Sequence, residues 1–266
     1  MFSVKGITCG YGSKIVLEGI DLSVARGEFF GVIGPNGSGK TTLLRAMARV
    51  LNLQQGEIFL NGEDIWRIPL KDFARKVAVV SQTVPSVPMT VEEFVLLGRL
   101  PHYRSLQFLE TEKDNDAAEH SMRVTGIEAL RGRLMDQLSG GERQLAAIAR
   151  ALAQEPEWLF LDEPTAHLDI AHQVRILDFL LRLNQSSNLT LIMVLHDLNL
   201  AGEYCRKLLL MRQGRTHKTG SAEEVLDRGT IENVYGTPVA VGKNPLSSRP
   251  FVLPVPAGKQ AGRERK

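Results

Sequence analysis

The sequence predicts an α/β fold from three observations. Short apolar runs, typical of buried strands, recur along the 266 residues. Amphipathic helical patterns follow two of these runs, beginning near Leu43 and near Ile170. The stretch from Met89 to Leu152 carries little strand signal and is predicted to be helical. The apolar runs are 29–33, 77–80, 158–161 and 189–195. Strands that alternate with helices favour a parallel sheet at the core.

The first eighty residues are predicted to be rich in β-structure around a single helix. Residues 2–8 alternate weakly and are interpreted as an edge strand, with a second strand near 20–24. A strand at 56–60 is followed by Asn61-Gly62, a dipeptide typical of hairpin turns. We therefore expect an antiparallel β-subdomain beside the parallel core.

The stretch EFFGVIGPNGSGKTT, residues 28–42, has the order of a strand, a glycine-rich loop and a helix. Glycines let backbone N–H groups approach an anion, and the helix adds its unpaired N–H groups and its dipole. Lys40 is expected to reach the β- and γ-phosphates, the Thr41 hydroxyl to ligate Mg²⁺, and Thr42 to contact the α-phosphate. The nucleotide-binding residues predicted in this way are Gly34, Pro35, Asn36, Gly37, Ser38, Gly39, Lys40, Thr41 and Thr42. The alternative is a glycine-rich turn with an unrelated lysine. Because every fixed position and both flanks match, the sequence predicts a P-loop that binds a nucleoside triphosphate.

Tyr11 lies in a GYG turn just ahead of the P-loop strand. An aromatic side chain at this place could stack on an adenine ring, or it could be an ordinary turn tyrosine. The sequence leaves both interpretations open.

The helical stretch carries a second candidate anion site at its end. Ser139 and Glu142 have the spacing of a capping box that opens a helix. Two glycines stand at this capped helix start, so the backbone N–H groups there could bind an anion. The residues of this turn are Ser139, Gly140, Gly141 and Glu142. An ordinary capped helix is the alternative. Thr90 and Glu93 have the same spacing and predict a helix start near Val91.

Polar residues follow several of the predicted core strands. Asp162, directly after the strand at 158–161, is the expected Mg²⁺ ligand, and Glu163 is expected to orient or deprotonate water. Gln82 follows the strand at 77–80, and His196 follows the strand at 189–195, where it is expected to contact a γ-phosphate. Helix caps are the alternative for the two acids, and a structural role is the alternative for the histidine.

Composition and charge place the chain among ordinary soluble proteins. Hydrophobic residues make up 43% and charged residues 23%, and the net charge is +2. Residues 241–266 carry six Lys or Arg and one acid and are rich in Pro and Gly, so we expect a loose basic tail after a domain of residues 1–240. The last strand is predicted at 207–211 and a final helix, capped by Ser221, at 221–226.

With 6% aromatic residues, no nucleic-acid-binding surface is expected. No apolar run is long enough to span a membrane, and no signal peptide or disulfide framework is evident.

Six motifs in a fixed order resemble those of the ATP-binding cassette (ABC) ATPases. They are GPNGSGKTT (34–42), Gln82, LSGGE (138–142), WLFLDEPT (158–165), HLD (167–169) and His196. The resemblance implies a P-loop NTPase (RecA-like) core with an antiparallel β-subdomain and an α-helical subdomain inserted at about 83–150. It also implies ATP and Mg²⁺ as cofactors, Gln82 as a further Mg²⁺ ligand, and catalytic roles for Gln82, Glu163, His196 and Asp169. In this family the LSGGE turn of one subunit covers the γ-phosphate bound by the other, which implies a head-to-tail homodimer.

A finer resemblance rests on GRLPHYR (98–104) and TAHLDIAHQ (165–173). These segments are similar to the ATPases of importers for ferric siderophores, haem and vitamin B12, although importers of other metal chelates and oxyanions share parts of them. The resemblance implies an integral membrane permease in two copies as partner, and indirectly an extracytoplasmic solute-binding protein. It places the chain peripherally at the cytoplasmic face of the inner membrane, with GRLPHYR where importers meet the permease. Glu142 stands where many cassettes have Gln.

Other uses of a cassette remain as alternatives. An iron–sulfur assembly ATPase or an importer subunit for another metal or for an oxyanion would keep all six motifs. Translation factors of the family carry two cassettes, and the DNA-repair members insert a long coiled coil, neither of which is present in this sequence. A small-molecule kinase would leave LSGGE and His196 without a purpose.

Overall fold

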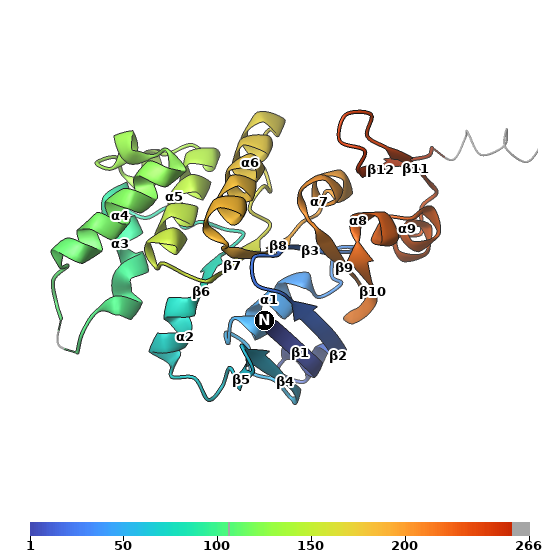
Figure 1. The fold of residues 1–266 in the computed structure, drawn as a ribbon, viewed down its shortest axis with the longest axis horizontal. Helices are drawn as coiled ribbons and strands as arrows, with labels where there is room; N and C mark the ends of the chain where they lie inside the picture. Colours follow the sequence, from blue (N-terminus) through green and yellow to red (C-terminus); the bar gives the residue numbers. More distant parts are fainter. Residues whose placement is uncertain (106, 257–266) are drawn as a thin grey trace, which may run out of the picture. The chain divides into compact units, whose positions relative to one another are not determined.

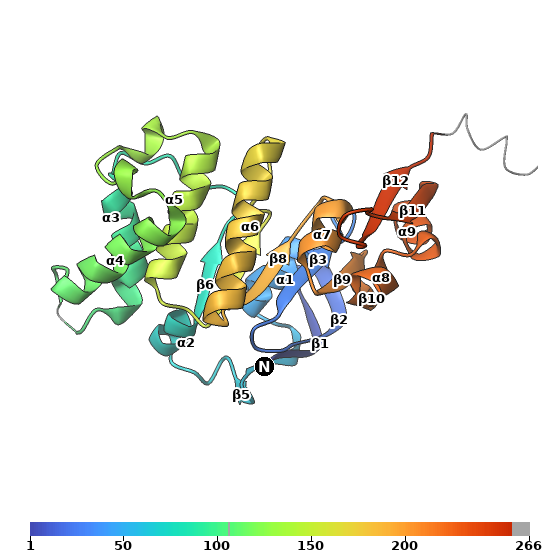
Figure 2. The same ribbon diagram turned by 45° about the horizontal axis from the view of Figure 1, so that its top comes forward.

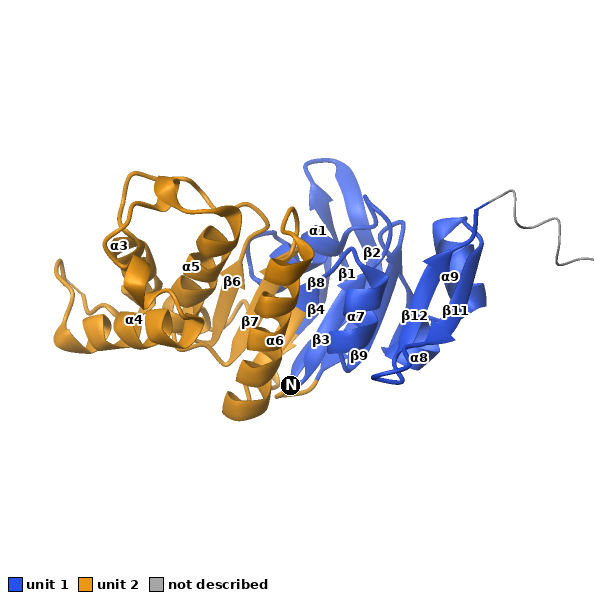
Figure 3. Cartoon of the chain, turned by 90° about the horizontal axis from the view of Figure 1, so that it is seen from above, with its two compact units in different colours: residues 1–24, 28–58, 193–266 blue, residues 25–27, 59–192 orange. Residues whose placement is uncertain are grey.

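The computed structural model describes residues 1–105 and 107–256, and its chain divides into two compact units (Figure 3). Unit 1 comprises residues 1–24, 28–58 and the described residues from Met193 onward. Unit 2 comprises residues 25–27 and 59–192.

Unit 1 contains the predicted antiparallel β-structure. Strands β1 (Phe2–Tyr11) and β2 (Lys14–Val24) pair in antiparallel order, and the first part of β4 (Gln55–Leu60) lies on the other side of β1 (Figure 1). The burial pattern follows the alternation of the sequence, with Val4, Ile7 and Ile20 facing the core. The β-subdomain predicted from the sequence is confirmed.

The second sheet of unit 1 carries the P-loop. Strand β3 (Phe29–Ile33) is buried along its whole length and pairs in parallel with β9 (Lys207–Arg212), as the continuous apolar runs predict. The end of β8 (Thr190–Val194) lies on the other side of β3, where the Leu195 N–H donates to the Val32 carbonyl at 3.1 Å. Helices α1 (Lys40–Met47) and α7 (Leu198–Tyr204) follow β3 and β8.

Unit 2 contains parallel strands and a group of helices. Strands β6 (Val77–Val80) and β7 (Trp158–Asp162) pair in parallel, and the first three residues of β8 lie next to β7. Helix α6 (Ile170–Ser187) connects β7 to β8. The short strand β5 (Glu63–Asp64) pairs with the end of β4 across the predicted Asn61-Gly62 turn. Helix α2 (Leu70–Lys76) is a second helix within the first eighty residues, where only one was expected.

Helices fill the stretch where the sequence showed little strand signal. Helices α3 (Val91–Leu96), α4 (Glu112–Thr125) and α5 (Gly140–Ala153) lie side by side (Figure 2). The short 3₁₀ helices are η1 (Leu97–His102), η2 (Glu128–Leu130) and η3 (Met135–Gln137). The GRLPHYR segment begins within η1, which directly follows α3. The capping boxes predicted for α3 and α5 are both present.

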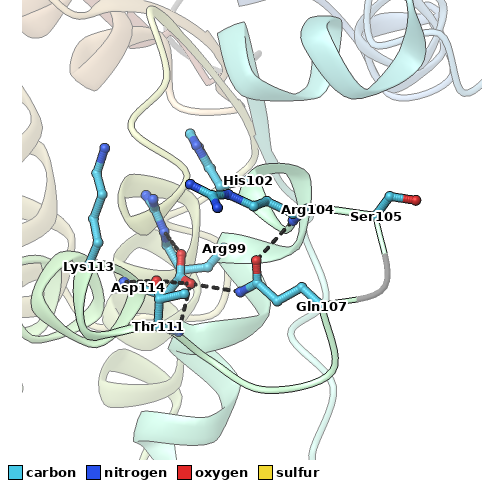
Figure 4. Close-up of a pocket in the computed structure, with 8 residues that line it drawn as sticks. All are labelled: Arg99, His102, Arg104, Ser105, Gln107, Thr111, Lys113 and Asp114. Carbon is cyan, nitrogen blue, oxygen red and sulfur yellow. Dashed lines mark hydrogen bonds and ion pairs between the residues drawn. The ribbon is translucent and has the colours of Figure 1, made fainter.

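A buried ion pair that the sequence did not reveal fastens η1 to its neighbours (Figure 4). Arg99 Nε donates to Asp114 at 3.1 Å, and Arg99 Nη1 donates to Glu155 at 2.8 Å and to the Ala153 carbonyl at 2.6 Å. Arg99 is 1% exposed and Asp114 is 4% exposed. Burial acts to raise the pKa of Asp114, but hydrogen bonds from Thr111 and Arg99 outweigh it and lower the pKa to about 2.

The C-terminal part is more structured than the sequence predicts. Strand β10 (Arg215–Ser221) pairs with β9, and helices α8 (Ala222–Val225) and α9 (Arg228–Tyr235) follow. Strands β11 (Val239–Lys243) and β12 (Pro250–Pro254) form an antiparallel hairpin. The expectation of a loose tail over 241–266 is therefore wrong up to Pro254, because paired strands replace it, and residues 257–266 lie outside the described part. Within the described ranges, no helix has both the length and the apolar character needed to cross a membrane.

Replacement of Arg99 by Leu is expected to lower the free energy of unfolding by about 3–5 kcal/mol, because the buried Asp114 carboxylate loses its charged partner. The measurement is urea unfolding at neutral pH. Arg104→Leu, in the same segment but at an exposed position, should change the stability by about 0.5 kcal/mol or less. Equal losses for both variants would contradict the role of the ion pair.

The pH dependence tests the same pair. The ordinary pKa of Asp114 is 3.8 and the folded-state value is about 2, so its carboxylate stabilises the fold above about pH 4, and this contribution is lost as the pH falls toward 2. Asp114→Asn should lack this part of the acid transition. A wild-type and a variant curve of the same shape between pH 4 and pH 2 would contradict it.

Candidate active site

The P-loop is held in place by close backbone contacts within unit 1. Gly34 follows β3 with φ +148°, and a Cβ there would collide with the Met211 carbonyl oxygen. Gly39 has φ +100°, and a Cβ there would lie 2.6 Å from Leu17 Cδ2. The Gly214 N–H donates to the Ser38 carbonyl at 3.0 Å. Both positions therefore strongly favour glycine.

Lys40 lies inside the loop that precedes it. Its side chain is 5% exposed, and Nζ donates to the carbonyls of Gly34 at 2.8 Å and Pro35 at 3.1 Å. The Ser38 hydroxyl is buried and has no hydrogen-bond partner among the described residues. Thr41 and Thr42 form the first turn of α1, while Asn36 and Gly37 form the exposed tip. The nine predicted residues thus form the loop before α1 and the first turn of that helix.

The N-terminus of α1 differs from those of most other helices in the described chain. The Ncap residue is Gly39, no side chain caps the helix, and its first turn contains no acid. Helices α3 to α9 each have a side-chain cap from Ser, Thr or Asp. A positive helix terminus with no side-chain acceptor, next to a buried ammonium group, fits the phosphates of a nucleotide.

Two tyrosines lie near the P-loop in unit 1. Tyr11 is 44% exposed at the end of β1, and its hydroxyl accepts a hydrogen bond from Arg45 on α1 at 3.0 Å. Its exposed ring leaves both interpretations of this residue open. Tyr235, which the sequence analysis did not single out, ends α9. Burial raises the pKa of Tyr235 to about 12. A hydrogen bond from the Gly34 N–H to the Tyr235 hydroxyl acts in the opposite direction and lowers the pKa, but burial is the larger effect. Only the fold brings a residue so distant in sequence to the P-loop.

In unit 2, the structure brings two predicted catalytic residues into contact. Gln82 Nε2 donates to Glu163 Oε2 at 2.7 Å. Asp162 and Glu163 are each 8% exposed at the end of β7. Glu163 has φ +51°, a conformation uncommon outside glycine that is typical of functional sites. The strand ends at Asp162, and the backbone turn at the next residue lets the carboxylate of Glu163 reach Gln82.

The second candidate anion site is a capped helix start, as predicted. Ser139 Oγ accepts from the Glu142 N–H at 3.3 Å, and Glu142 Oε2 accepts from the Ser139 N–H at 2.8 Å. The Ser139 hydroxyl and N–H hold the pKa of Glu142 below its usual value. Gly140 and Gly141 form the first turn, and a Cβ at Gly141 would lie 2.7 Å from the His172 ring. A larger residue at Gly141 would therefore require the His172 ring to move.

Asp169 and His196 lie at helix starts. Asp169 is the Ncap of α6 and accepts from the His172 N–H at 2.9 Å, which holds the pKa of Asp169 below its usual value. His196 is exposed and directly precedes Asp197, the Ncap of α7. The structure thus gives Asp169 a capping function and places His196 at the end of the core strand β8, as predicted.

A glycine loop between a buried parallel strand and a helix, with a buried lysine and an uncapped helix start, defines a P-loop nucleoside triphosphatase. The comparison with known families makes the assignment more specific. The sequence model of the ABC transporter family matches residues 17–166.

Curated relatives match over nearly the whole chain. "Probable siderophore transport system ATP-binding protein YusV" of Bacillus subtilis is 38% identical over 97% of this chain and 94% of its own length. "Ferric enterobactin transport ATP-binding protein FepC" of Escherichia coli is 39% identical over 94% of this chain and 92% of its own length.

Solved structures agree with these matches. The structure described as "An inward-facing conformation of a putative metal-chelate type ABC transporter" is similar with a TM-score of 0.84 at 26% identity, covering 97% of this chain and 98% of that chain. A dimeric bacterial ABC transporter cassette is similar with a TM-score of 0.74 at 28% identity, covering 84% of this chain and 99% of that chain. The chain belongs to the ABC transporter family, and it is an ATP-binding and ATP-hydrolysing cassette. The fold class predicted from the sequence is confirmed.

Replacement of Gly39 by Ala is expected to destabilise the nucleotide-free protein by about 1–3 kcal/mol, because the left-handed backbone and the contact with Leu17 both oppose a Cβ. The measurement is urea unfolding without nucleotide. Gly37→Ala is the matched control, since Gly37 has φ +75° but no atom within 4 Å of a Cβ. It should show only the backbone part of the loss, and a larger loss at Gly37 than at Gly39 would contradict the account.

Proposed function

We propose that this chain is the ATP-hydrolysing subunit of an importer for an iron chelate, that is a ferric siderophore or haem, or for cobalamin. The observation that carries the proposal is the similarity, over nearly the full length, to ATP-binding proteins named for siderophore and ferric enterobactin transport. A metal-chelate type transporter among the similar structures supports the same class of cargo.

The residues of the P-loop bind the triphosphate in this proposal. The Lys40 ammonium holds the β- and γ-phosphates, the backbone of residues 34–42 surrounds them, and Thr42 contacts the α-phosphate. Tyr11 lies against the adenine. The uncapped start of α1 supports these roles, because it offers N–H donors to an anion.

The oxygen donors of Thr41, Asp162 and Gln82 are the proposed Mg²⁺ ligands. A hydroxyl, a carboxylate and an amide carbonyl are ligands that this hard cation accepts. Gln82 uses its Nε2 for Glu163, which leaves its carbonyl oxygen for the metal. Bound Mg²⁺ supplies charge neutralisation on the β- and γ-phosphate oxygens.

Glu163 is proposed to orient the attacking water and to accept its proton, while His196 holds the γ-phosphate. The hydrogen bond from Gln82 fixes the Glu163 carboxylate at the end of β7. Because Gln82 touches both the carboxylate and the proposed metal, its amide links metal binding to the position of the base.

The second anion site is proposed to act on a second copy of the chain. Ser139, Gly140, Gly141 and Glu142 would cover the γ-phosphate held by the P-loop of the partner, with Asp169 beside them. One chain offers a single LSGGE turn and a single P-loop, so a head-to-tail homodimer uses each of them once. The dimeric cassette among the similar structures supports this arrangement.

Residues 1–240 are proposed to form the cassette, with the helical stretch 83–150 as the subdomain that docks on an integral membrane permease present in two copies. The GRLPHYR segment would lie at that junction, and an extracytoplasmic solute-binding protein would deliver the cargo. The chain then works peripherally, at the cytoplasmic face of the inner membrane. The transport systems for which the relatives are named support these partners.

The variants Glu163→Gln and Lys40→Ala separate hydrolysis from binding. Glu163→Gln should reduce ATP turnover by about 10²–10⁴-fold and leave ATP affinity intact, because only the proton acceptor is lost. Lys40→Ala should lose ATP binding itself. Phosphate release and nucleotide titration measure the two effects. Glu112→Gln, at an exposed position of α4, is the control, and wild-type turnover in Glu163→Gln would exclude the assigned role.

Reconstitution tests the transport function. ATP turnover should rise when the protein is combined with the permease that it works with, and a ferric siderophore, haem or cobalamin should accumulate in proteoliposomes. Glu163→Gln serves as the transport-negative control. If the rate of ATP turnover does not change with any membrane partner, the result would favour a cassette that moves no cargo, such as an iron–sulfur assembly ATPase.

A further inference from the structure

The C-terminal hairpin of β11 and β12 packs against helix α7 and is hydrogen-bonded to it. Helix α7 begins two residues after His196. The two elements are neighbours in unit 1 (Figure 3). The contact uses one amide side chain, one glycine and one carboxylate of α7, and each of these meets a different part of the hairpin.

The amide of Asn199 bonds to both polar backbone groups of one residue in β12. The Val252 N–H donates to Asn199 Oδ1 at 2.7 Å, and Asn199 Nδ2 donates to the Val252 carbonyl at 3.3 Å. In this way the side chain of Asn199 imitates a neighbouring strand at the free edge of β12.

The sequence of β12 leaves Val252 as the residue suited to this contact. The pairs Val255–Pro238 and Asn244–Arg249 are joined by ladder hydrogen bonds outside the strands. Because hydrogen-bonded and non-hydrogen-bonded pairs alternate, the backbone groups of residues 250, 252 and 254 point away from β11. Two of these three residues are proline and have no N–H. The remaining N–H, that of Val252, goes to Asn199.

Two further contacts fix the same helix. A Cβ at Gly202 would lie 3.0 Å from the Pro250 carbonyl, so the hairpin passes directly over that residue. The Glu203 carboxylate accepts from Ser247 Oγ at 2.7 Å and from Asn244 Nδ2 at 3.3 Å, both in the hairpin loop. Helix α7 is therefore held at its first turn and at its last turn.

The first turn of α7 is bonded to Asp197, the residue that directly follows His196. Asp197 Oδ1 accepts from the Asn199 N–H at 2.7 Å and from the Leu200 N–H at 3.0 Å. On the other side of His196, the Leu195 N–H bonds to Val32 in β3. His196 thus lies between a strand end bonded to β3 and a helix start that is bonded to β12 through Asn199, so a shift of that turn would displace the backbone next to the histidine.

We propose that Asn199 is a positioning residue for ATP hydrolysis, through which the C-terminal hairpin (239–254) fixes His196. This inference rests on the role proposed above for His196 at the γ-phosphate. The proposal assigns the hairpin a part in turnover rather than in nucleotide affinity. The three contacts that hold α7 act on the helix that follows His196, whereas the phosphates are bound by a different segment, the P-loop at the start of α1.

The test is a kinetic comparison of full-length variants. Asn199→Ala should lower kcat by about 10-fold and leave the KM for ATP within about twofold, because misplacement of a catalytic group affects the transition state. Asn199 is exposed, so the variant should fold. Val252→Pro removes the same hydrogen bond from the other side without touching the β11 ladder and should show the same loss. Val252→Ala is its matched control, since it trims the side chain and keeps the N–H, and it should retain wild-type kcat.

Double variants decide whether the effects share one path. Asn199→Ala combined with Val252→Pro should be no slower than either single variant, and Asn199→Ala should cause no further loss in a His196→Ala background under single-turnover conditions. Additive losses, an effect on KM alone, or wild-type kcat in Asn199→Ala would overturn the inference.

The same experiment separates the two proposals. If His196→Ala retains wild-type kcat, the role of His196 fails and the inference fails with it. If His196→Ala loses turnover while Asn199→Ala does not, the inference fails alone.

Discussion

The nucleotide site depends on how closely the backbone packs where β3 turns into the P-loop. Gly34 lies against the Met211 carbonyl and Gly39 against Leu17, and neither position has room for a Cβ. The turn between β9 and β10 adds the hydrogen bond from Gly214 to Ser38. Backbone contacts therefore fix the loop from the side of β9 and β10, whereas the start of α1 carries no side-chain cap. The result is a rigid donor surface that needs little reorganisation when phosphate binds, which is the condition for strong electrostatic binding.

At the end of β7, the catalytic carboxylate is also positioned by the backbone, here through an unfavourable left-handed conformation at Glu163. All five residues of β7 are buried, so the strand fixes Asp162 firmly. Glu163 then takes a left-handed conformation that disfavours a non-glycine residue by about 1–2 kcal/mol. The surrounding sheet and the hydrogen bond from Gln82 offset this energy. Two adjacent carboxylates can thereby serve different tasks, one at the end of the strand and one turned away from it.

Local signals in the sequence predicted the parts of the structure that depend on neighbouring residues. The P-loop, the Asn61-Gly62 turn and the capping boxes of α3 and α5 each involve residues within a few positions, so their spacing is visible in one dimension. Helix α2 was missed because its Ncap residue is Pro69, which provides no side-chain cap. The ion pair of Arg99 with Asp114, and the bond of Tyr235 to Gly34, join residues that only the fold brings together. Periodicity and spacing carry no information about such contacts.

The C-terminal hairpin shows why composition alone misjudged that region. In a prediction from composition, Pro250 and Pro254 favour a loop. In the hairpin, both occupy positions whose N–H would point away from β11, so they interrupt no ladder hydrogen bond. The same prolines protect the outer edge of β12 from pairing with another chain, and Asn199 covers the position between them. An edge closed by a side chain of α7 cannot shift without that helix, and α7 starts beside His196. The hairpin that composition suggested to be a loose tail is thus joined to helix α7 through Asn199 and Val252.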